Sequence, residues 1–356
     1  MEMLADTLIL HIGLAKTGTT TLQKRCFEQF DNTITPDSDE DWKRVATDDF
    51  LTFFMKYNPS AGNTEQSQKY SQKIKNACSR TQGKPLFISN ENIVHRNYFS
   101  EISPTPFYGM QLDHFTASQY IDSLKTLCPW ISKIKIILTL RNQPEWLASL
   151  YAERSNDLRW PSQEDFEQRV RDLLRDDSLN GGGFLNWERL RANLIQGVGS
   201  DNVYVLLLED IKTYEFWNTL SEASELPFDP DFFILKSNER ENVRRTTSRE
   251  WLIAKRNANF RGFDHTSRFW RGIDCVLHKN SILQNIGNAT INKTNNAYIK
   301  AVNRANPHLD YLRGRACSFR LSDEFAKEIR TYCNPFNRDL AQGLGINFAE
   351  LAKKGY

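Results

Sequence analysis

The chain has 356 residues, of which 40% are hydrophobic and 25% charged, proportions typical of a globular enzyme that exclude disorder on a large scale. Its formal net charge is only +2, so we expect no nucleic-acid partner. No run of about 18 apolar residues occurs, so we also expect no membrane span.

The cysteines and the N-terminus indicate a reducing compartment. The six cysteines are widely spaced and form no C-x-x-C pair, so we expect individual, reduced thiols. Glu2 and Asp6 stand where a secretory signal would carry basic residues. These features predict a cytoplasmic protein, unless an anchor precedes the sequence given.

The first predicted element is a short buried strand, Leu8 to Ile12, and a loop from Gly13 to Gly18 follows it. A helix is expected from Thr19 to Phe30. Successive backbone N–H groups converge at such a junction, and glycine lets the backbone approach an oxyanion closely. The stretch therefore predicts a phosphate-binding loop.

The position of the lysine distinguishes this loop from a Walker A loop. Gly13 and Gly18 have the Walker A separation, but the lysine is Lys16, inside the loop, and Thr19 stands at the usual lysine position. Lysine at that position reaches the γ-phosphate, and the hydroxyl after it holds magnesium. The loop therefore favours a nucleotide without a γ-phosphate and a site without metal.

The next segments are less regular. Residues 31–49 are acidic and rich in turn formers, so we expect a loop there, followed by short helices over 50–57 and 66–78. A second strand, Pro85 to Ser89, runs directly into Glu91 and His95. Ligands of parallel sheets collect beyond the carboxyl ends of strands, so both side chains are expected near the nucleotide.

A third strand, Ile134 to Leu140, ends at Arg141, and Pro144 suits the first turn of the helix that follows. Ser149 lies two turns into that helix, on the same side as Arg141. A fourth strand is expected over 202–208. Four strands alternating with helices predict an α/β fold with a P-loop-type parallel sheet, helices flanking it, and helical and loop insertions.

The C-terminal part is more basic and less patterned. Residues 236–320 carry 17 Lys and Arg against 6 Asp and Glu, which indicates either solvated helical faces or a surface that faces an anion. A helix is expected from Ser322 until Asn334 and Pro335 end it, with a last helix over 337–344. We expect one domain over 1–356, with a nucleotide-binding core in 1–226 and a basic segment in 227–356 that completes the site.

Two segments resemble the sulfotransferases that use 3′-phosphoadenosine 5′-phosphosulfate (PAPS), most closely the bacterial branch that acts on carbohydrates. One is the loop up to Leu22, and the other begins at Arg141. The resemblance implies that Arg141 and Ser149 hold the 3′-phosphate. It also implies that the 5′-phosphosulfate is bound by Ala15, Lys16, Thr17, Gly18, Thr19, Thr20 and Thr21. Arg244 and Arg245 are further candidate contacts of the 3′-phosphate, from charge alone.

The same resemblance implies the chemistry. Glu91 is the candidate general base that takes the proton of the attacking hydroxyl, and His95 is the alternative. Lys16 is the candidate catalytic cation, because negative charge grows on the bridging oxygen as adenosine 3′,5′-bisphosphate leaves. No metal is implied.

The acceptor is expected to be a hydroxyl, with a carbohydrate or glycan, and among these an anionic glycan, as the candidate class. Loops over 100–116, 156–183 and 236–320 would select it. The sequence carries no signal for oligomeric state. Two other functions remain open, namely a P-loop kinase and a protein that binds PAPS or another nucleotide without catalysis.

Overall fold

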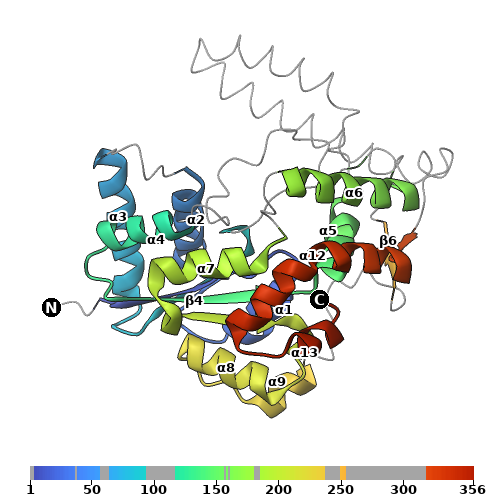
Figure 1. Ribbon diagram of the computed structural model, residues 1–356. Helices are drawn as coiled ribbons and strands as arrows, with labels where there is room; N and C mark the ends of the chain where they lie inside the picture. The colour runs from blue at the N-terminus through green and yellow to red at the C-terminus, as the bar shows by residue number, and fades with distance from the viewer. Residues whose placement is uncertain are drawn as a thin grey trace, which may run out of the picture.

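A computed structural model of the chain (Figure 1) gives the fold. It describes residues 4–36, 38–56, 64–93, 117–155, 158, 161–179, 185–236, 249–253 and 318–356. The predictions for His95, Arg244, Arg245 and the loop over 100–116 lie outside these residues, as does most of the segment over 236–320. The segment over 156–183, expected to contribute a loop, is largely described and is mostly helix, Gln163–Leu179.

A five-stranded parallel sheet forms the centre of the molecule, in the order β2-β3-β1-β4-β5. The strands are β1 (Thr7–His11), β2 (Thr33–Ile34), β3 (Leu86–Ser89), β4 (Lys133–Leu140) and β5 (Val203–Leu207). The chain runs toward one edge of the sheet after β1 and toward the opposite edge after β4, so the topological switch lies between these two neighbours. The predicted α/β class is confirmed.

Side chains alternate between the two faces of the sheet, and each face has its own apolar core. On β1, Leu8 and Leu10 belong to one core and Ile9 to the other, as the two-residue period of a strand requires. The first core is covered by α2 (Asp41–Lys56), α3 (Thr64–Arg80), α4 (Ala117–Leu127) and α7 (Trp187–Val198), and the second by α1 (Thr19–Leu22), α8 (Tyr214–Ser224) and α9 (Pro230–Lys236). Figure 1 shows α7 and α8 on opposite sides of β4.

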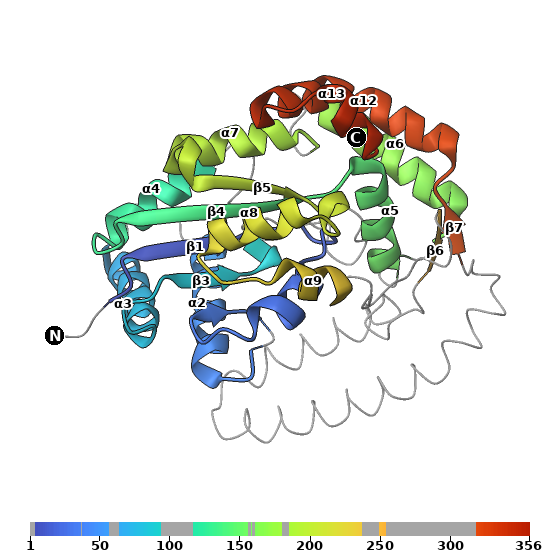
Figure 2. The same ribbon diagram turned by 90° about the horizontal axis from the view of Figure 1, so that it is seen from below.

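A group of helices lies beyond the carboxyl end of β4, where the chain enters α5 (Figure 2). This group contains α5 (Gln143–Arg154), α6 (Gln163–Leu179), α12 (Asp323–Leu344) and α13 (Phe348–Lys353). A small antiparallel pair, β6 (Glu250–Leu252) and β7 (Ser318–Arg320), packs with them. None of the helices in the described ranges is long and apolar enough to cross a bilayer.

The expectation of a loop over 31–49 is wrong in two places. Thr33 and Ile34 form the edge strand β2, which is too short to leave a pattern in the sequence. Helix α2 begins at Asp41 rather than near residue 50. Asp41 and Asp48 are exposed on this helix, whereas Ala46 and Phe50 are buried at helical spacing.

Two helix boundaries also differ from the sequence prediction. The helix after the loop is α-helical only to Leu22 and continues as a π-helical turn, Gln23–Phe27. Pro335 does not end α12, which continues to Leu344. The buried side chain of Asn337, just after the proline, exchanges amide hydrogen bonds with Gln143 of α5 at 2.7 and 3.2 Å, and this packing keeps the second half helical.

His11 is a fully buried polar side chain at the carboxyl end of β1. Its ring nitrogens lie 2.7 Å from the hydroxyl of Ser89 on β3 and 2.7 Å from the hydroxyl of Thr139 on β4. Burial lowers the pKa of His11 from 6.5 to about 3. The ring is therefore neutral at ordinary pH and links the ends of the three central strands.

We predict that His11 makes the protein less stable in mild acid. Between pH 6.5 and about 3 the unfolded chain binds a proton that the folded protein excludes, so the free energy of unfolding falls as pH is lowered, by about 1.4 kcal/mol per pH unit. Urea unfolding at pH 7 and pH 5 should show a drop that is about 2 kcal/mol larger in wild type than in His11→Gln. Equal drops would contradict this account.

Candidate functional site

The predicted loop joins β1 to α1 and contains two residues with left-handed backbone. Lys16 has φ 69° and Gly18 has φ 82°. A Cβ at Gly18 would lie 2.6 Å from Cδ1 of Leu208, and a Cβ at Gly13 would lie 2.5 Å from Cγ2 of Thr19. A side chain at either position would have to displace its neighbour, and the left-handed backbone favours glycine at Gly18 in addition.

The loop backbone is held by hydrogen bonds from its own threonine and from the β4–α5 segment. The Thr17 hydroxyl donates to the carbonyl oxygen of Leu14. The indole Nε1 of Trp146 donates to the carbonyl of Ala15 at 2.8 Å, and Nη1 of Arg141 donates to the carbonyl of Lys16 at 3.3 Å. The loop after β1 and the segment after β4 thus form one unit at the switch point of the sheet, where ligands of such sheets bind.

Glu91 lies against this loop. It begins a 3-10 turn, Glu91–Ile93, directly after β3, and its carboxylate accepts a hydrogen bond from the hydroxyl of Thr19. Glu91 therefore lies beside the loop, whereas its closeness to a nucleotide and its role as a base stay predictions. Thr20 and Thr21 are half-buried on the first turn of α1.

Two cationic side chains of the site are paired with carboxylates of α5. Nη2 of Arg141 lies 2.7 Å from Oε2 of Glu145, and Nζ of Lys16 lies 2.7 Å from Oε1 of Glu153. Ser149 is half-buried between the two glutamates in the sequence, and the spacing of four residues puts all three on one face of the helix. Arg141 and Lys16 therefore pair with the face of α5 that also carries Ser149.

A second set of contacts supports the start of α5. The side-chain oxygen of Asn142 caps this helix by accepting a hydrogen bond from the backbone N–H of Glu145. The backbone N and the side-chain Nδ2 of Asn142 donate to Oε1 of Glu209 at 3.0 and 2.8 Å. Burial raises the pKa of Glu209, although the bonds from Asn142 oppose the shift. The buried hydroxyl of Tyr356 donates to the other oxygen of Glu209 at 3.3 Å, and burial raises the pKa of this phenol well above 10.

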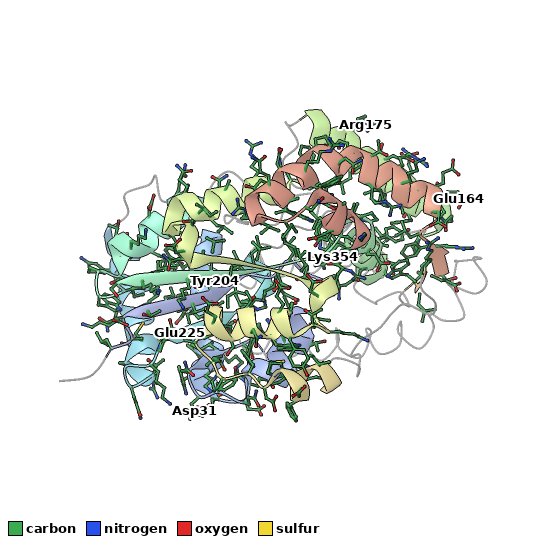
Figure 3. The ribbon with its side chains drawn as sticks, turned by 60° about the horizontal axis from the view of Figure 1, so that its bottom comes forward. Asp31, Glu164, Arg175, Tyr204, Glu225 and Lys354 are labelled. Carbon is green, nitrogen blue, oxygen red and sulfur yellow. The ribbon has the colours of Figure 1, made fainter. Side chains whose placement is uncertain are left out.

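The residues at the end of the chain hold this corner from outside. Lys354, labelled in Figure 3, forms an ion pair with Asp210, and its carbonyl accepts from Nδ2 of Asn142 at 3.3 Å. Tyr204 and Glu225, labelled in the same figure, lie elsewhere on the fold, where they surround Lys135 of β4.

Sequence reasoning missed several of these residues. Glu145 and Glu153 could have been found, because they flank Ser149 at intervals of four on a predicted helix. Trp146 gave no signal, since an indole in a helix is most often part of a core. The contact between Glu209 and Tyr356 joins residues far apart in sequence, and nothing local indicates it.

Within the described ranges, no group of three or more His, Cys, Asp or Glu side chains has an arrangement that could hold a metal ion. The cysteines at 26, 78, 128 and 333 are buried thiols.

No family model and no curated protein sequence matches the chain. Among solved structures, one similar chain is a sulfotransferase from Alicyclobacillus acidocaldarius. The match covers 64% of this chain and 83% of that chain, at 14% identity and a TM-score of 0.36.

Proposed function

We propose that this protein is a sulfotransferase that moves the sulfonate group from PAPS to a hydroxyl, with a carbohydrate or glycan as the acceptor class. One observation carries the proposal. Arg141, which follows β4, donates to the backbone carbonyl of the loop lysine, Lys16, at the switch point of the sheet, and Glu91, which follows β3, accepts from Thr19 at the end of the loop. A donor with one anionic group at each end fits two cations placed in this way.

The contact between Thr19 and Glu91 favours this interpretation over a P-loop kinase. A kinase of that class has lysine at position 19, where the ammonium reaches the terminal phosphates. Here the position holds a hydroxyl, and that hydroxyl donates to a carboxylate. A second carboxylate, Glu153, pairs with the only lysine of the loop. These contacts suit a donor that brings no γ-phosphate.

The residues support a direct transfer of the sulfonate. As the acceptor oxygen forms its bond to sulfur, the bond between sulfur and the 5′-phosphate oxygen breaks, and adenosine 3′,5′-bisphosphate leaves. Glu91 would accept the proton of the acceptor hydroxyl. The ammonium of Lys16 would stabilise the charge that grows on the departing oxygen, and the guanidinium of Arg141 with the hydroxyl of Ser149 would hold the 3′-phosphate.

The identity of the acceptor stays a prediction, and so does the expectation that it is an anionic glycan. The single domain over 1–356 and the role of its basic segment, 227–356, also stay predictions.

We predict that PAPS and adenosine 3′,5′-bisphosphate bind without metal. Calorimetric titration in EDTA should give saturable binding of both nucleotides, because the loop and Arg141 supply the positive charge. Binding of ATP with magnesium, together with no binding of PAPS or adenosine 3′,5′-bisphosphate in EDTA, would replace the sulfotransferase interpretation with the kinase one.

We predict that Arg141→Ala selectively weakens the binding of nucleotides that carry a 3′-phosphate. Loss of a charge-assisted contact should cost about 1.5–3 kcal/mol for adenosine 3′,5′-bisphosphate and much less for adenosine 5′-phosphosulfate, which lacks that group. Calorimetry with both nucleotides measures the difference. Since Arg141 also bonds the loop carbonyl of Lys16, an equal loss for both would mean that its role is structural.

We predict that Glu91→Gln lowers turnover by roughly 10²- to 10⁴-fold, the usual contribution of a general base, with little change in nucleotide affinity. The amide oxygen of glutamine can still accept from Thr19, so the loop contact is kept. Lys16→Ala should reduce both turnover and affinity, because the ammonium contacts the donor before and during transfer. The turnover of each variant is measured as the rate at which radiolabelled sulfonate is transferred from PAPS to a panel of glycans and alcohols.

Comparison of Glu91→Gln with His95→Ala identifies the general base. If Glu91→Gln keeps near-normal turnover, while His95→Ala binds PAPS and is inactive, the base is His95. If both variants keep turnover, neither side chain is the base. A protein that binds PAPS and transfers nothing to any acceptor would be a nucleotide-binding protein.

A further inference from the structure

One face of α5 carries a carboxylate, a hydroxyl and a second carboxylate at intervals of four residues, namely Glu145, Ser149 and Glu153. Each carboxylate is 2.7 Å from one cation of the proposed donor site, Arg141 and Lys16 respectively. The helix that offers the hydroxyl therefore also supplies a counter-ion for each cation. Both ion pairs belong to the same site, although Arg141 follows β4 and Lys16 follows β1.

The Lys16–Glu153 pair can open without disturbing the loop. The loop backbone is fixed by the Thr17 hydroxyl, by Trp146 and by Arg141, and none of these bonds involves Glu153. The side chains of Lys16 and Glu153 are also 29% and 33% exposed. A partly solvated pair of this kind contributes little stability, so an anion of higher charge can replace the carboxylate at low cost.

We propose that Glu153 is an internal counter-ion that competes with the donor's phosphate and sulfonate oxygens for the ammonium of Lys16. The carboxylate holds the ammonium in place when the site is empty, yields it when the nucleotide binds, and takes it back as adenosine 3′,5′-bisphosphate leaves. Glu153 thus sets the affinity of the site for its nucleotides. This inference rests on the proposed function.

The sign of the effect on affinity separates this role from a structural one. If Glu153 competes for Lys16, then removing its charge tightens nucleotide binding. If Glu153 positions Lys16 for the nucleotide, the same change weakens binding. Glu153→Gln keeps the size and polarity of the side chain and removes only the charge, so it tests the two alternatives directly.

The experiment is calorimetric titration of adenosine 3′,5′-bisphosphate in EDTA at low ionic strength, with wild type, Glu153→Gln, Lys16→Met and the double variant. We expect Glu153→Gln to lower Kd by about two- to fivefold, the range for partly exposed ion pairs. In the Lys16→Met background the same substitution should change Kd by much less, because the cation for which it competes is absent.

Glu145→Gln is the matched control, since it makes the same change on the same helix face but beside Arg141. Its effect should be equal with and without Lys16, whereas the effect of Glu153→Gln should depend on Lys16. Glu153→Asp, which keeps the charge, should remain closer to wild type than Glu153→Gln does.

Weaker or unchanged binding by Glu153→Gln, beside a wild type that binds, would overturn the counter-ion role and leave the proposed function standing. The counter-ion role would also be overturned if Glu153→Gln tightened binding equally with and without Lys16. If wild type itself fails to bind adenosine 3′,5′-bisphosphate, the proposed function fails and this inference fails with it.

Discussion

The site depends on the hydrogen bonds that tie the loop after β1 to the segment after β4. Trp146 and Arg141 donate to the consecutive carbonyls of Ala15 and Lys16. Because Trp146 is almost fully buried, its bond is shielded from water, and breaking it would leave an unpaired indole N–H and carbonyl at a cost of about 1–3 kcal/mol. These bonds keep the left-handed backbone of Lys16 in place, and with it the direction of the loop.

The remaining contacts support the donor side of those bonds. Asn142 precedes α5 and is held by Glu209 at the end of β5, and Tyr356 bonds the same carboxylate. The next residue, Gln143, forms two hydrogen bonds with the side-chain amide of Asn337 on α12, and both side chains are fully buried. The end of the chain therefore fixes the start of α5, which in turn fixes the loop. A polar network of this kind is stiff only when every member has its partner.

Electrostatics of the site follow from the same arrangement. Lys16 and Arg141 face carboxylates of α5, and the third carboxylate, Glu91, faces Thr19. The positive charge that an anionic nucleotide would need is thus held in ion pairs. Binding of the proposed donor would then exchange one anion for another, with a smaller net free energy than the neutralisation of bare cations.

The sequence by itself determined the strand, loop and helix around Lys16, the strand that ends at Arg141, and the closeness of Glu91 to the loop. These predictions hold because each rests on a local pattern of apolar residues and glycines, and because parallel strands bring their carboxyl ends to one edge. Only the tertiary structure decided what each charged group contacts. Edge strand β2 has two residues, Pro335 stays inside a helix through the packing of Asn337, and Tyr356 reaches Glu209 across 147 positions. Short strands, tolerated prolines and distant polar pairs are set by packing in three dimensions, which no local pattern encodes.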